Sequence, residues 1–129
     1  MAIYTQLPIY RASYNLLLEI CRMQKDIPKD SRYTIGQALK SKAMDIIVLI
    51  YRASRSQHKV NTIMTMRETL LEVQVYIRLL CDMRQISEKR YSALAEQTSG
   101  MSKQMAAWEK SERAKREGKN SDGRQVADE

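Results

Sequence analysis

"KVNTIMTMRETLLEVQVYIRLLCDMR", from Lys59 to Arg84, is the stretch that decides the fold. Its apolar residues alternate spacings of three and four, the coiled-coil-like periodicity of a helix that packs along its whole length. We therefore predict a helix over 59–84 with one side buried. The residues expected on its inner stripe are Ile63, Met66, Leu70, Val73, Ile77 and Leu80.

Three further stretches show the same spacing between short polar or Pro-containing breaks. They predict helices over 8–26, over 31–54 with Asp30 or Ser31 as its cap, and from the N-cap Ser87 onwards. The residues expected on their inner faces are Tyr14, Leu17, Leu18 and Cys21 in the first helix, Ile35, Leu39, Ala43, Ile46, Ile47 and Ile50 in the second, and Tyr91, Leu94, Thr98, Met101, Met105 and Trp108 in the last.

Four helices joined by short breaks predict an all-α fold, an antiparallel up-down-up-down four-helix bundle. A chain of 129 residues with 4 Gly and 2 Pro suits one helical domain. After Trp108 the apolar side ends, and the segment from Gly118 to Glu129 is rich in Gly, Asn, Asp and Ser. We therefore divide the chain into a bundle domain, 1–111, and a flexible charged tail, 112–129.

The net charge of +7 belongs to the part of the chain that is expected to fold. Residues 109–129 hold six basic and six acidic groups, so residues 1–108 hold 16 basic and 9 acidic groups. A basic folded surface indicates an anionic partner, and nucleic acid is the first candidate. The alternative is that the charge serves solubility alone.

An antiparallel bundle gathers these cations at its two ends. The link between the second and third helices is expected near Arg11 of the first helix and Lys103 or Lys110 of the fourth. Basic residues at helix ends can instead complement helix C-termini, which suits Arg52 and Arg84. The candidate nucleic-acid-binding residues at the two ends are Arg52, Arg55, His58, Lys59, Arg84, Lys89, Arg90 and Lys103.

The sequence offers little for catalysis. His58 is the only histidine, Cys21 and Cys81 form no CxxC pair, and no Gly-rich phosphate loop is present. We expect no catalytic residue, metal or cofactor. The longest apolar run, Ile46 to Ile50, is far too short to span a bilayer, and no export signal opens the chain. Buried, reduced thiols are expected, which favours a cytoplasmic protein.

Five segments taken together resemble a known family, and they cover about Leu7 to Ser111. The similar family is the small four-helix-bundle accessory variability determinant of diversity-generating retroelements. Related ribosomal RNA intervening-sequence proteins share the bundle, but their Ser-Ile-Pro-Ser-Asn segment has no counterpart here. Where relatives often have Gly-Gly-Trp, this chain has Ala106, Ala107 and Trp108. The segments are RYTIG (32–36), LIYRAS (49–54), YIRLLCDMRQIS (76–87), RYSALAE (90–96) and GMSKQMAAW (100–108).

The resemblance implies a homopentameric, barrel-like assembly that is not itself a polymerase. Such an assembly would bind the reverse transcriptase of the same element and its template RNA, with the cDNA as a further ligand, and would support cDNA synthesis that is error-prone at template adenines. The rival interpretations are a ribosomal RNA-associated bundle and a structural helical scaffold without a polymerase partner. A membrane-surface role fits poorly, because the cations are dispersed and the tail is neutral.

Overall fold

The computed structural model describes residues 3–128, with side chains described to residue 118, and this part of the chain is helical without a strand. The long helices α1, α3, α4 and α5 follow the predicted order. The elements are the 3-10 helix η1 (Tyr4–Gln6), α1 (Pro8–Gln24), α2 (Lys29–Arg32), α3 (Ile35–Arg55), α4 (Lys59–Asp82) and α5 (Glu88–Asp128).

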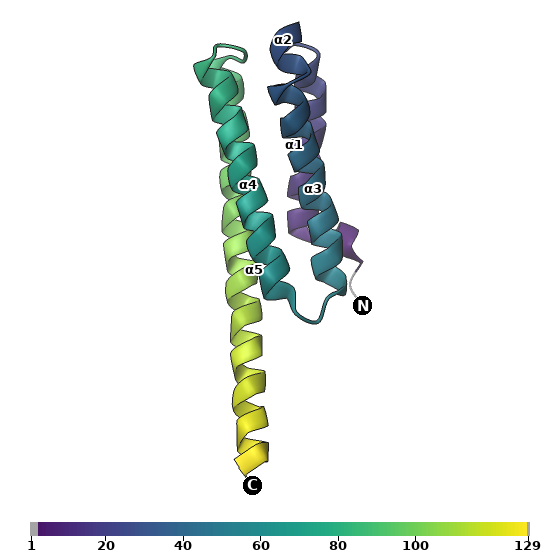
Figure 1. Cartoon of the computed structure of the whole chain (residues 1–129), viewed down its shortest axis with the longest axis vertical. Helices are drawn as coiled ribbons and strands as arrows, with labels where there is room; N and C mark the ends of the chain where they lie inside the picture. The colour runs from purple at the N-terminus through teal and green to yellow at the C-terminus, as the bar shows by residue number, and fades with distance from the viewer. Residues whose placement is uncertain (1–2, 129) are drawn as a thin grey trace.

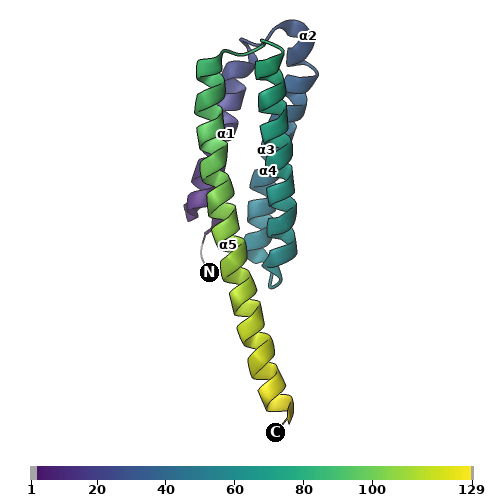
Figure 2. The ribbon, with the colours of Figure 1, turned by 90° about the vertical axis from the view of Figure 1, so that its left-hand side faces the viewer.

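The four long helices lie side by side and alternate in direction (Figures 1 and 2). Helix α3 packs against α1 and α4, and α5 packs against α4 and α1. Helices α3 and α5 are therefore diagonal partners across the bundle. The predicted all-α, antiparallel arrangement is confirmed over the residues that the structure describes.

Helix α5 continues beyond the bundle and runs to Asp128 (Figure 2). Where it leaves the bundle, Glu109 accepts hydrogen bonds from Arg113 Nε at 2.9 Å and from Arg67 Nη1 of α4 at 3.0 Å. These two bonds lower the pKa of the Glu109 carboxyl. The division into a bundle, 1–111, and a flexible tail, 112–129, stays a prediction; Glu129 lies outside the described residues.

The six residues predicted for the inner stripe of α4 belong to the core, and none of these six is more than 2% exposed. In α5, Leu94, Thr98, Met101 and Met105 are buried, as predicted. Helix α3 likewise buries four of its six predicted residues, namely Leu39, Ala43, Ile46 and Ile50. Half-buried positions that were expected in the core are Ile35, Ile47, Tyr91 and Trp108.

The predicted inner face of α1 is wrong. Tyr14 and Cys21 are exposed, and Leu17 and Leu18 are half-buried. The cause is that α1 is apolar on two sides, and the side that faces the core carries the serine Ser13. Both cysteines are free. The prediction that they are buried is wrong for Cys21, which is exposed, and Cys81 is only half-buried. The residues that α1 buries are Ile9, Ser13, Leu16, Ile20 and Met23.

The second predicted helix is broken, and neither Asp30 nor Ser31 caps it. Helix α2 ends at Arg32, and α3 begins at Ile35 without a side-chain cap. The physical reason lies in Arg32, which donates to two carbonyl oxygens of the segment that follows α1, Lys25 O at 2.8 Å and Ile27 O at 3.1 Å. These bonds hold α2 over the end of α1, so the chain turns again before α3.

Arg84 occupies the turn between α4 and α5 with a φ of 58°. The Gln85 N–H donates to Leu80 O at 2.8 Å, and the Arg84 N–H donates to Cys81 O at 2.9 Å. This pair of bonds is the Schellman motif, in which glycine is usual because a left-handed residue with a Cβ is strained. Arginine here carries a backbone cost of about 1 kcal/mol.

The variant Arg84→Gly is therefore expected to raise the free energy of unfolding by about 1 kcal/mol, measured by urea denaturation. Arg84→Ala is the matched control, because it removes the same guanidinium but keeps the Cβ. Equal stabilities for the two variants would contradict the assignment of strain to the backbone.

Candidate nucleic-acid interface

The link between α3 and α4 brings four candidate residues to one end of the bundle (Figure 1). Arg52 and Arg55 lie in the last turn of α3, His58 occupies the N-cap position of α4, and Lys59 is the first residue of α4. Because α1 runs antiparallel to α3, its first turns, which include Arg11, lie at the same end (Figure 1). We call this end the link end.

The parts of α1, α3 and α4 that form the link end contain no acids, and the carboxylate nearest to them on α5, Glu109, is paired with Arg67 and Arg113. Residues 1–18 and 46–67 contain no Asp or Glu, so all nine carboxylates that precede residue 109 lie within 19–45 and 68–96. The two acid-free segments form the start of α1, the end of α3 and the start of α4, which meet here. This signal is present in the sequence, but the residue-by-residue interpretation missed it.

The cations of the link end differ in whether they bond to the protein itself. Lys59 Nζ donates to Ala53 O at 2.8 Å and so caps the end of α3. Within the described part of the chain, Arg52 and Arg55 are exposed and form neither an ion pair nor a bond to a helix carbonyl. Arg52 and Arg55 lie in the last turn of α3, where their charges complement the helix end, and their exposed guanidinium groups are accessible to a ligand.

Beside these arginines lies a row of four aromatic rings that the sequence interpretation did not include. Tyr14 stacks on Tyr10 with ring centroids 6.2 Å apart, Tyr10 meets Tyr4 edge-on at 5.4 Å, and Tyr4 meets Tyr51 at 5.1 Å. The Arg55 guanidinium lies over the Tyr51 ring, 5.5 Å from its centroid. The spacing of four between Tyr10 and Tyr14 is the sequence signal for part of this tyrosine row.

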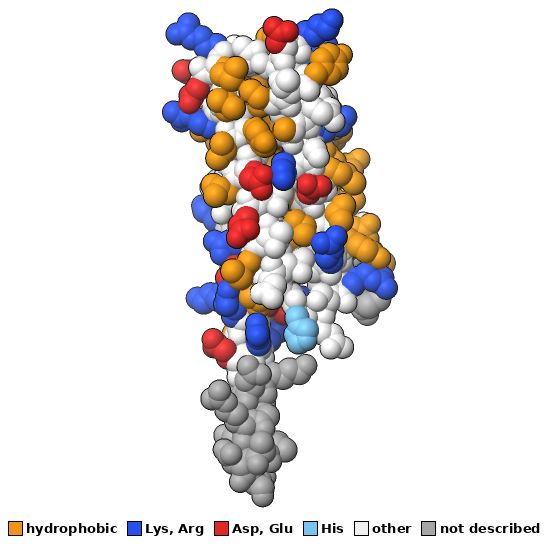
Figure 3. All heavy atoms as spheres, viewed as in Figure 1, with side chains coloured by type: hydrophobic (Ala, Val, Ile, Leu, Met, Phe, Trp, Pro, Cys, Tyr) orange, Lys and Arg blue, Asp and Glu red, His pale blue; other side chains and the backbone are white. Residues whose placement is uncertain are grey.

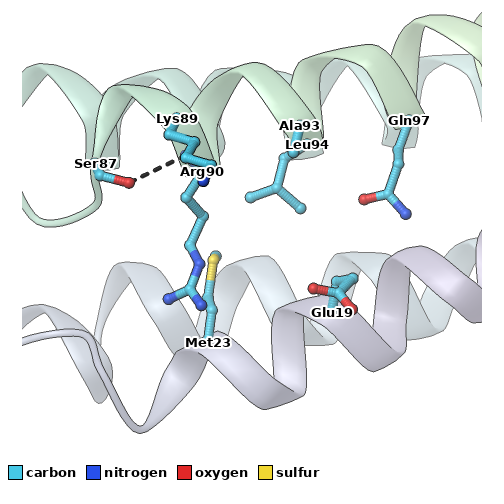
Figure 4. A pocket seen from close by; sticks show the side chains of 8 residues that line it. All are labelled: Glu19, Met23, Ser87, Lys89, Arg90, Ala93, Leu94 and Gln97. Atoms are coloured by element: carbon cyan, nitrogen blue, oxygen red, sulfur yellow. Dashed lines mark hydrogen bonds between the residues drawn. The ribbon is translucent and has the colours of Figure 1, made fainter.

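At the opposite end one of the three candidate cations, Arg90, is engaged in structure, while Arg84 and Lys89 are exposed. Ser87 accepts a bond from the Arg90 N–H at 3.1 Å, which confirms it as the cap of α5. The Arg90 side chain reaches past Met23 into the hollow between α1 and α5 (Figure 4). Its Nη1 atom pairs with Asp26 at 3.2 Å.

Lys103 is separate from both groups. Its neighbour Ser102 lines a groove with Leu70 and Gln74, about halfway along α4. Lys103 is exposed on α5, diagonally across the bundle from α3. The structure therefore does not join Lys103 with Arg52 and Arg55 in one patch.

Among residues 3–118, no three His, Cys, Asp or Glu side chains gather closely enough to hold a metal ion. No helix in the described chain combines the length and the apolar character needed to cross a bilayer. The sequence matches no protein-family model and no curated protein.

Proposed function

We propose that this chain is a non-catalytic, cytoplasmic, nucleic-acid-binding accessory subunit of a diversity-generating retroelement. In this role it binds the reverse transcriptase and the template RNA of the element and supports mutagenic cDNA synthesis. The observation that carries the nucleic-acid part is the link end, where Arg11, Arg52 and Arg55 are exposed on segments of α1 and α3 that contain no Asp or Glu. The identity of the element and of its polymerase rests on the family resemblance.

Phosphate is the ligand that suits the link end best. Arg11, Arg52 and Arg55 are exposed and lack ion-pair partners within the described residues. Guanidinium groups bind phosphate oxygens through two parallel hydrogen bonds, and each phosphate bound releases counterions. Such contacts hold the backbone of a nucleic acid and do not read its sequence. An accessory subunit that acts along a template requires this kind of binding.

Self-association, as a pentamer by resemblance, is the second part of the proposal. Helix α4 carries apolar side chains on its solvent side, and Figure 3 shows hydrophobic side chains gathered over this part of the molecule. An exposed apolar face of this kind marks a site of contact with another surface. A ring of copies would repeat the link end around its circumference. The residues of this outer face are Met64, Leu71, Val75, Leu79 and Met83, which are 39 to 59% exposed.

Salt-dependent binding of a labelled single-stranded RNA, followed by fluorescence anisotropy, tests the nucleic-acid role. Three phosphate contacts, from Arg11, Arg52 and Arg55, predict a log-log slope of about −2.1, so a fourfold rise in salt weakens binding about 20-fold. The double variant Arg52→Ala/Arg55→Ala removes two contacts, which brings the slope to about −0.7. Lys59 is kept, because its loss would also uncap α3.

The matched control is Arg84→Ala/Lys89→Ala, which removes the same charge from the other end and is expected to keep most of the slope. If the two double variants exchange these results, the binding site lies at the Arg84 end. A wild-type chain that binds no RNA in moderate salt would refute the nucleic-acid role. A reverse transcriptase gene beside the gene for this chain, and co-purification of the two proteins, would separate the retroelement role from that of a ribosomal RNA-associated bundle.

A further inference from the structure

Four of the seven tyrosines of the chain form the tyrosine row, which crosses the seam between α1 and α3. Tyr4 and Tyr10 are half-buried, and Tyr4 packs between Tyr10 and Tyr51. These two rings fasten η1 to the bundle. The outer rings have no such task, because Tyr14 is 48% exposed and Tyr51 is 43% exposed. Packing therefore explains the middle of the row but not its ends.

The Tyr51 end of the row is also cationic. A shallow groove on α3 is lined by Val48, Tyr51, Arg52, Arg55 and Ser56. The guanidinium of Arg55 lies over the Tyr51 ring, which presents a planar, charged surface next to an aromatic one. Figure 3 shows hydrophobic side chains with Lys and Arg side chains beside them on this flank of the molecule.

Flat aromatic rings beside unpaired guanidinium groups are the elements of a site for single-stranded nucleic acid. Exposed bases stack on aromatic rings and on guanidinium planes, while cations follow the phosphate backbone. In a duplex the faces of the bases are covered by their neighbours, so rings on a helix surface reach them poorly. Contacts between copies are assigned above to the outer face of α4, which lies apart from this groove on α3.

We propose that the tyrosine row binds unpaired bases by stacking on Tyr14 and Tyr51, while Arg11, Arg52 and Arg55 hold the adjoining phosphates. This inference rests on the proposed nucleic-acid role and adds a preference for single strands. Stacking on any base makes the site tolerant of sequence, which suits the copying of a variable template.

The test compares the affinities of wild type, Tyr14→Leu and Tyr51→Leu for a short unstructured RNA and for its duplex with the complementary strand. Each Leu variant is expected to weaken single-strand binding about 5- to 150-fold. Duplex affinity and the salt slope are expected to stay unchanged, because no charge is removed. Tyr14→Phe and Tyr51→Phe keep the rings and are expected to bind within about twofold of wild type, since stacking uses the ring face and not the hydroxyl.

Tyr14 and Tyr51 lie on different helices and both are exposed, so two independent variants guard against loss of folding, which circular dichroism checks. Leu variants that bind the single strand like wild type would overturn the stacking proposal, while the loss of slope in Arg52→Ala/Arg55→Ala would still support the nucleic-acid role. Equal weakening on single strand and duplex would also overturn it. A Leu variant that changes the oligomeric mass but not RNA affinity would assign the row to contacts between copies. If wild type binds neither RNA, both proposals fail.

Discussion

Ile77→Ala is expected to lower the free energy of unfolding by about 2 to 5 kcal/mol. Ile77 is 1% exposed and belongs to the α4 stripe that packs between α3 and α5. Replacing it by Ala removes buried methyl and methylene groups and leaves a cavity that two neighbouring helices close only in part. Urea denaturation of wild type and variant at the same chain concentration measures the loss.

Met44→Ala is the matched control for Ile77→Ala. It also shortens an apolar side chain in the middle of a long helix, but Met44 is 47% exposed. Its effect is expected to stay within about 0.5 kcal/mol. A loss below about 1 kcal/mol for Ile77→Ala, in the lower part of the range for point substitutions, would mean that α4 packs through another face.

The difference between α4 and α1 shows how far hydrophobic spacing predicts the core. Helix α4 has one unbroken inner stripe between two neighbours, so all six residues that the spacing predicted are buried, and only Val60 and Thr69 were not predicted. Helix α1 has apolar residues on two sides, and the spacing favoured the side with Tyr14 and Cys21. The buried side contains Ser13, whose hydroxyl has no hydrogen-bond partner among the residues that the structure describes. Which side of such a helix is buried depends on the whole bundle and cannot be predicted from its own residues.

The candidate site, too, could be predicted from the sequence only in part. Helix order alone predicts that Arg52, Arg55, His58 and Lys59 meet at one end, because the link is short. The partners of individual cations depend on the relative heights of helices that are distant in sequence. Arg90 pairs with a carboxylate 64 residues earlier in the chain. Lys59 turns back to a carbonyl of α3, which leaves Arg52 and Arg55 as the free cations of that group within the described residues.

The tyrosine row was also not predicted from the sequence. Tyr10 and Tyr14 lie four residues apart on one helix, but Tyr4 precedes α1 and Tyr51 belongs to α3. The row exists because η1 folds against both helices, and nothing in the local pattern predicts that contact. The absence of Asp and Glu from 1–18 and 46–67 was readable in the sequence, and its meaning depended on the antiparallel order that brings the two segments together.

Leu71→Glu/Val75→Glu is expected to convert an oligomer into single chains. Leu71 is 59% exposed and Val75 is 57% exposed, at the centre of the outer face of α4. A contact between copies through this face would have to bury two carboxylates without partners, which costs far more than such an interface gains. Light scattering at micromolar concentration measures the mass, which we expect to be that of a pentamer for wild type. Helicity is expected to stay unchanged, because both positions face solvent in the chain.

Ser99→Glu, an exposed substitution on α5, is the control and is expected to keep the oligomeric mass. A wild type that is already a single chain would contradict self-association, and a double variant that keeps its mass would place the contact elsewhere.

The double variant Leu71→Glu/Val75→Glu also tests whether the link ends of several copies bind one RNA together. Leu71 and Val75 lie on α4, away from Arg52 and Arg55 at the end of α3. If a ring presents several link ends to one RNA, its dissociation into single chains is expected to weaken binding by about 100-fold or more, although no cation has been removed.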